Sequence, residues 1–170
     1  SEHAQILLLL LANAYGPLSA RDLLGLAPEH FVDADQIALA IAPLARFVIG
    51  DAESGYIFSH QKLRELYRER LDTQTLAEWN ARFVRYGKQA YREPTPYLCR
   101  FLMNHMRDAG EWQFARHLLA DFSPQQAWAE AHYALEGSYN GYLRDLEVLQ
   151  TWAIEQNDLA LQIKCALIAS

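Results

Sequence analysis

The apolar residues of this sequence depart from helical spacing in one place only, and that departure constrains the fold more than any other feature. Two short β-rich runs, Phe47 to Ile49 and Tyr56 to Phe58, flank six residues of turn chemistry between Gly50 and Gly55. Runs of this kind, separated by a short glycine-containing turn, predict a β-hairpin. We therefore expect one pair of strands in a chain whose other apolar residues recur at helical spacing.

Three short helical segments come before the hairpin. The first, at about Ala4 to Ala14, ends at a turn containing Gly16 and Pro17. Ser19, with Asp22 three residues later, predicts a capping box at the start of the second. In the third, Pro43 removes a backbone donor and should tighten the last turn. Three short helices followed by a hairpin are typical of a winged helix, which we predict for residues 1–72 with a two-stranded β-wing.

The sequence from Gln61 onward has only the period of helices. A short amphipathic helix is expected to end near Asp72, and Thr75 with Glu78 predicts the capping box of the next helix. Glycine and proline signals divide the rest into further helices without an exact repeat period. We predict a helical connector over residues 73–170, a TPR-like or solenoid-like bundle, so the fold class is mainly α.

The composition indicates a folded, acidic protein. The chain has 170 residues, 51% of them apolar and 21% charged, which is enough to bury a core. Its 15 basic and 21 acidic residues give a net charge of −6. The predicted third helix and the wing are themselves acidic, which argues against a grip on phosphate backbones. We expect no nucleic-acid partner, although a winged-helix transcription regulator is the alternative that this fold suggests.

The cysteines and the longest apolar run bear on the cellular compartment in which the protein is expected. Only two cysteines occur, Cys99 and Cys165, without the spacing of a disulfide framework or a zinc site. The aliphatic run from Ile6 to Leu11 is far shorter than the ~20 residues of a membrane span. We expect a buried helix there, no membrane partner and a cytoplasmic location.

No catalytic motif is visible. The sequence has no Walker A loop, dinucleotide fingerprint, G-x-S-x-G elbow or H-E-x-x-H helix, so we assign no catalytic residues and expect that the segment is not an enzyme. His132 and Glu136 are four residues apart on one helix and could share a metal ion. A metal site needs at least one more ligand, and none is suggested. We therefore predict no metal.

An aromatic stripe provides a third hypothesis. Trp79, Phe83 and Tyr86 recur at helical spacing, as in a helical-repeat scaffold that binds peptides along such a face. Aromatic residues at this spacing are more often buried against the next helices. We expect this stripe to be core.

Residues 47 to 66 resemble a known family. The string Tyr56-Ile57-Phe58-Ser59-His60-Gln61-Lys62-Leu63 is similar to the winged-helix domain of STAND signalling ATPases, the NB-ARC and NACHT-like group, in which a strand ends in a histidine directly before a helix. Gln61 stands where family members often have Asp. The stretch from Tyr97 through Trp112 to Phe122 is similar to the helical connector of bacterial members.

The resemblance implies a non-catalytic regulatory segment that couples the ADP or ATP state of a signalling NTPase to a sensor or effector domain. His60 matches the histidine that points at the β-phosphate of ADP in that family. No cofactor is implied within this segment, whereas the parent protein would bind ADP and ATP. The implied partners are the nucleotide-binding domain of the same chain, downstream sensor repeats and protein partners on activation. The segment is then expected to be an excised piece of a larger protein.

Overall fold

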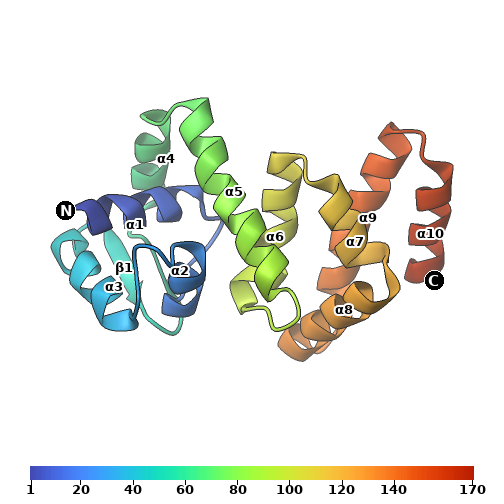
Figure 1. Ribbon diagram of the computed structural model, residues 1–170, viewed down its shortest axis with the longest axis horizontal. Coiled ribbons are helices and arrows are strands. Elements are labelled where there is room, and N and C mark those ends of the chain that lie inside the picture. The colour runs from blue at the N-terminus through green and yellow to red at the C-terminus, as the bar shows by residue number, and fades with distance from the viewer. The chain divides into compact units, whose positions relative to one another are not determined.

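The computed structural model describes residues 1–170 and is mainly helical, as predicted. It contains ten α-helices, one 3-10 helix and one two-stranded antiparallel sheet (Figure 1). The chain divides into two compact units, residues 1–86 and residues 87–170. This division falls inside helix α5, Thr73–Ala90, whereas the predicted domain boundary lies after residue 72.

Unit 1 combines short helices with the hairpin. Its elements are α1 Glu2–Asn13, α2 Ala20–Leu26, α3 Ala34–Ile41, the 3-10 helix η1 Ala42–Leu44, β1 Val48–Asp51, β2 Gly55–Phe58, α4 Gln61–Glu69 and most of α5. The capping box of Ser19 and Asp22 is confirmed, since each side chain accepts from the other residue's backbone N–H. The 3-10 turn at Pro43 confirms the tightened end of the third helix.

The predicted start of α5 is wrong by three residues, because Thr75 was expected to be the N-cap and Asp72 has that place. The helix begins at Thr73, because the Asp72 carboxylate accepts the Thr75 backbone N–H at 2.6 Å and so caps an earlier turn. Thr75 therefore lies inside the helix instead of preceding it.

The hairpin forms as predicted, but its strands extend further into the expected turn, to Asp51 and Gly55. Val48 pairs with Phe58 and Asp51 with Gly55, and the Asp51 carboxylate accepts the backbone N–H groups of Glu53 and Ser54 in the turn. One pairing has no counterpart in the sequence analysis. Leu18 exchanges two backbone hydrogen bonds with Tyr56, at 2.8 and 3.0 Å, and so adds a single-residue bridge to β2.

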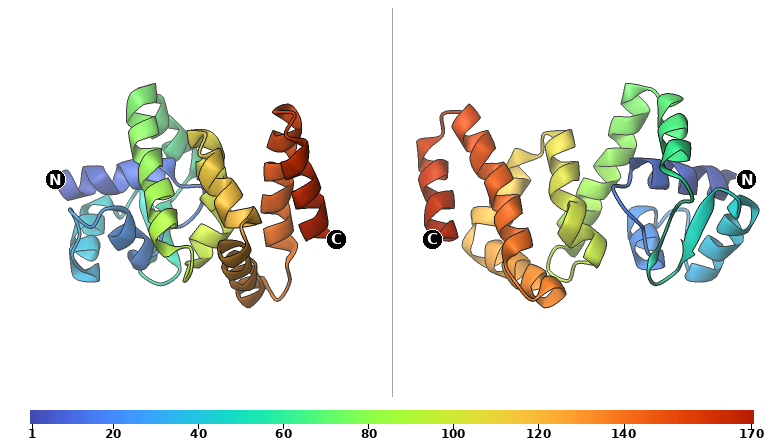
Figure 2. Two further views of the ribbon diagram at one scale, coloured as in Figure 1. Left: turned by 45° about the vertical axis from the view of Figure 1, so that its right-hand side comes forward. Right: turned by 180° about the vertical axis from the view of Figure 1, so that it is seen from behind.

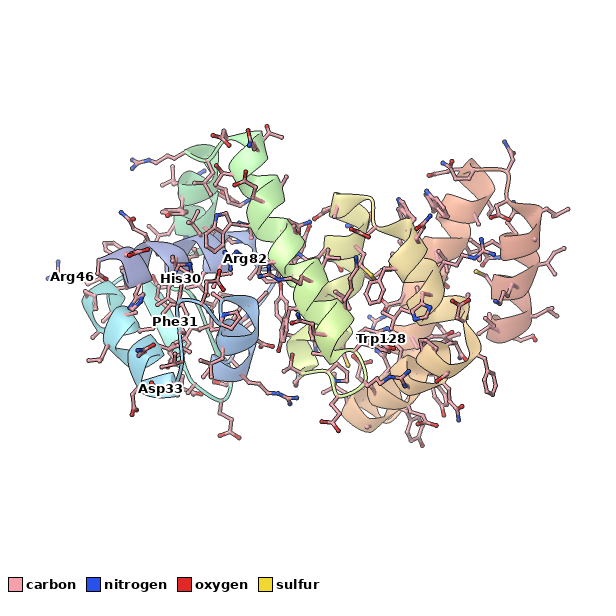
Figure 3. The ribbon with its side chains drawn as sticks, in the orientation of Figure 1. His30, Phe31, Asp33, Arg46, Arg82 and Trp128 are labelled. Atoms are coloured by element: carbon pink, nitrogen blue, oxygen red, sulfur yellow. The ribbon has the colours of Figure 1, made fainter.

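The core of unit 1 explains the aliphatic run and the aromatic stripe. Leu7 and Leu10 of α1 are fully buried, together with Phe31, which Figure 3 labels beside α3. Phe83 is also fully buried, and the Tyr86 hydroxyl donates to Asp22 at 2.9 Å. The stripe is core at these two positions, as expected, whereas Trp79 is only half-buried.

Unit 2 is built of helices only. They are α6 Pro96–Ala109, α7 Trp112–Ala120, α8 Phe122–Glu136, α9 Asn140–Glu155 and α10 Leu159–Ala169. Gly110 ends α6 in the left-handed conformation, with φ 67°, which lets the chain reverse into α7. Helices α9 and α10 form a hairpin, as both views of Figure 2 show.

Unit 2 contains one buried tryptophan and a stacked pair of half-buried ones. Trp128, labelled in Figure 3, is fully buried, and Trp112 stacks on Trp152 with ring centroids 5.0 Å apart. The Tyr142 hydroxyl donates to the Leu119 carbonyl at 2.7 Å, which ties α9 to α7. None of the ten helices has the length and apolar character needed to cross a membrane.

Candidate functional site

His60 lies at the junction between β2 and α4. Its backbone is extended, with φ −146° and ψ 134°, so the chain leaves the strand and enters the helix at this residue. The ring is the N-cap of α4, because Nδ1 accepts the backbone N–H of Lys62 at 3.2 Å. The side chain is exposed to solvent. The strand-end position expected from the sequence is therefore present, and the ring also has a capping role.

The capping bond determines what the rest of the ring can do. A ring nitrogen that accepts a hydrogen bond carries no proton, so in the neutral imidazole of His60 the proton resides on Nε2. Nε2 has no partner within the chain and is an exposed donor. It stands at a helix N-terminus, where the helix dipole favours an anion.

Residues of α4 near His60 are occupied by local contacts. The Gln61 amide donates to Glu65 at 3.2 Å, and Lys62 pairs with the same carboxylate at 3.3 Å. One turn further on, Arg68 donates to the Ala12 carbonyl at 2.9 Å and so fastens α4 to the end of α1. This long-range bond was not predicted, since nothing local in the sequence pairs these residues. It holds the helix that follows His60 in a fixed place within unit 1.

An apolar cleft of about 450 Å³ lies between α1, the hairpin and α4. Phe47 and Leu66 line it and are each 47% exposed, and Phe58 lies 6.2 Å from the ring of Tyr67, measured between centroids. Burial raises the pKa of the Tyr67 hydroxyl. His60 directly precedes the helix that forms one wall of this cleft. The exposed donor of His60 therefore lies at the start of the helix that carries the exposed apolar surface.

The surface that a DNA-binding winged helix would use is acidic or apolar. Asp35 and Leu39 are exposed on α3, with Leu39 at 75%, and Asp51 and Glu53 are exposed on the hairpin. Arg46 is the one basic residue between Asp33 and Phe47, and Figure 3 labels it near the end of that segment. The surface offers few cations to phosphate groups.

The second histidine considered from the sequence, His132, lies in the core of unit 2. Its Nε2 donates to the Asp145 carboxylate at 3.2 Å, and the Trp128 indole donates to the same oxygen at 3.1 Å. Burial raises the pKa of the Asp145 carboxyl, which the two donors offset only in part. No group of three or more His, Cys, Asp or Glu side chains is arranged to hold a metal ion. Asp145 was not predicted, because it approaches His132 only through the packing of α9 on α8.

Comparison with protein-family models, with curated proteins and with solved structures gives no match to this chain.

Proposed function

We propose that this chain is a non-catalytic regulatory segment of a STAND-type signalling ATPase, in which unit 1 is a winged helix and His60 donates a hydrogen bond to a phosphate of bound ADP. The observation that carries the proposal is the state of the His60 ring. Its Nδ1 is used by the α4 cap, and its Nε2–H is exposed at the helix N-terminus. A fixed donor at a helix N-terminus suits a phosphate oxygen, because the helix dipole favours an anion there.

The order of elements supports the winged-helix part of the proposal. A helix, the Leu18 bridge, two more helices and then the two hairpin strands follow one another, and Leu18 pairs with the second of those strands. This is the arrangement in which a wing is joined to its three helices by a small sheet. The apolar cleft beside α4 supports contact with another protein domain, since exposed apolar surface of this kind is found where proteins associate.

A switch requires that a contact differ between two states. A hydrogen bond between His60 and a phosphate that exists only in the closed, ADP-bound state would favour that state. Hydrogen bonds to charged groups contribute roughly 1.5 to 3 kcal/mol, which corresponds to a change of about one to two decades in the ratio of closed to open forms.

The first test of the proposal is the sequence encoded upstream of this segment. The proposal requires a nucleotide-binding domain next to this segment, so a Walker A and Walker B pair should be encoded within a few hundred residues upstream. In the full protein, His60→Ala should lower ADP retention after purification and raise effector output. A neighbouring region without nucleotide-binding motifs would contradict the proposal, as would unchanged ADP retention.

The acidic surface argues against the rival function of a transcription regulator, and the buried stripe argues against peptide binding along Phe83 and Tyr86. No observation favours either rival over the proposed regulatory role.

A further inference from the structure

A second cleft lies wholly within unit 2, between α6, α8 and α9, and has a volume of about 480 Å³. Three arginines line it, Arg100 and Arg107 from α6 and Arg144 from α9. Its carboxylates are those of Glu136 and Asp145. The cleft therefore concentrates guanidinium groups in a chain whose net charge is −6.

The carboxylates do not neutralise all three arginines. Glu136 pairs with Arg144 at 3.6 Å, and Asp145 is buried and accepts from His132 and Trp128. Arg107 approaches only the adjacent carboxylate along the chain, at 4.0 Å, and Arg100 has no ion pair. The guanidinium group of Arg100 is thus unpaired, and that of Arg107 has only the long contact with Asp108, so both can bind an anionic ligand.

The free donors form a row on one face of α6. Arg100, Asn104 and Arg107 are spaced i, i+4 and i+7, so the two arginine backbones lie about 10 Å apart along the helix. The Asn104 amide lies between them and makes no hydrogen bond within the chain. A side-chain amide offers one acceptor and two donors, which complement the C=O and N–H of a peptide group.

The wall of the cleft contains an unsatisfied polar atom. His132 is 1% exposed, and its Nδ1 has no hydrogen-bond partner. Buried polar atoms of native proteins nearly always have a hydrogen-bond partner. An unpaired buried polar atom is therefore expected more often at a functional site than elsewhere in a core. Met103 and Val148 add apolar surface to the same wall.

From this geometry we propose that the cleft binds an acidic peptide segment of a protein partner. The guanidinium groups would bind Asp or Glu carboxylates, Asn104 would pair with a peptide group, and the apolar wall would contact an apolar side chain between the acidic residues. About three residues of extended peptide span the ~10 Å between the arginines. A single phosphate group fits less well, because donors spread along a helix do not converge on one point. The proposal is independent of the role of His60.

The test is a fluorescence anisotropy titration of the whole chain with the fluorescein-labelled peptide Glu-Glu-Leu-Glu-Glu. We expect saturable binding that weakens as salt is added, and no binding of the peptide Gln-Gln-Leu-Gln-Gln. The double variant Arg100→Glu/Arg107→Glu should weaken binding by about tenfold or more, because it replaces two attractive charges with repulsive ones. The matched control Arg46→Glu/Arg85→Glu makes the same change in net charge at two exposed arginines outside the cleft. It should bind like the wild type.

Three results would overturn the proposal. The first is the absence of saturable peptide binding to a wild-type chain whose circular dichroism shows it folded. The second is an equal loss of affinity in both double variants, which would indicate unspecific attraction. The third is calorimetric binding of tripolyphosphate that Arg100→Glu/Arg107→Glu abolishes, in a chain that does not bind the acidic peptide, which would assign the cleft to phosphates instead.

Discussion

His60 and His132 carry the same ring in opposite surroundings. His60 is exposed and uses one nitrogen to cap α4, so the other nitrogen faces solvent as a donor. His132 is buried and uses one nitrogen on Asp145, so the other remains unpaired in the core. Only the first has a ring nitrogen that is exposed to solvent. The second contributes to the wall of a cleft and to the packing of α8 on α9.

His132 lies so close to Gly141 that the effect of Gly141→Ala on stability should depend on whether His132 is present. A Cβ on Gly141 would lie 2.6 Å from His132 Nδ1 and 3.1 Å from Glu136 Oε2. Gly141→Ala should therefore destabilise the wild type by about 1 to 3 kcal/mol through overpacking. In a His132→Ala background the clash is gone, and Gly141→Ala should be neutral or stabilise α9 by up to about 1 kcal/mol through helix propensity. Urea unfolding of the four proteins measures this, and equal effects in both backgrounds would contradict it.

The two cysteines should be unreactive in the folded chain. Burial raises the pKa of the Cys99 thiol to about 12, and burial also raises that of Cys165. Since the thiolate is the reactive form, neither should react with a disulfide reagent at pH 8 on the time scale of a free thiol. Both should react once guanidinium unfolds the chain. Rapid reaction of Cys99 in the native chain would mean that the cleft it lines opens in solution.

Asp72 determines the residue at which α5 begins. Hydrogen bonds from the backbone N–H and hydroxyl of Thr75 hold the pKa of the Asp72 carboxyl below its usual range. A carboxyl whose pKa is lower in the folded state stabilises the fold above its unfolded pKa, and that stabilisation is lost as the pH falls through the folded pKa.

Asp72→Ala should therefore lower the urea midpoint of unfolding at pH 6, and the difference from the wild type should shrink toward pH 3. Glu53→Ala, at an exposed carboxylate of the hairpin turn, is the control and should change little at either pH. A difference that is as large at pH 3 as at pH 6 would show that the carboxylate charge does not act through the cap.

Elements were predictable where local chemistry determines them. The hairpin, the Ser19 capping box and the left-handed Gly110 each have a signal within a few residues, and the structure contains all three. The Leu18 bridge to Tyr56 has no such signal, because a single paired residue forms no pattern. The bond from Arg68 to Ala12 depends on how α4 packs on α1.

The candidate sites were likewise predictable only where a local signal exists. The position of His60 at a strand end was readable from the change of period, but its capping bond was not. Arg100 and Arg107 share a helix face that the spacing reveals. Their meeting with Arg144 and His132 in one cleft requires the packing of three helices, which no local pattern encodes.

At the scale of the whole molecule, charge separates the proposed function from DNA binding. The net charge of −6 and the acidic α3 and hairpin oppose contact with a phosphate backbone. The chain should therefore give no sequence-selective binding to duplex DNA in a fluorescence polarisation assay at moderate salt. A sub-micromolar, sequence-selective complex would contradict this expectation and favour the hypothesis of a transcription regulator.

Whether His60 donates to a nucleotide phosphate can be measured as the rate of ADP release from the full protein carrying His60→Ser. Serine is a strong N-cap, so the variant keeps the start of α4, whereas its short side chain cannot extend a donor as far as Nε2. We expect the stability of the chain to stay within about 0.5 kcal/mol of the wild type, while ADP is released about ten to a hundred times faster. Unchanged ADP release from a stably folded His60→Ser protein would contradict the proposal and leave His60 as a helix cap.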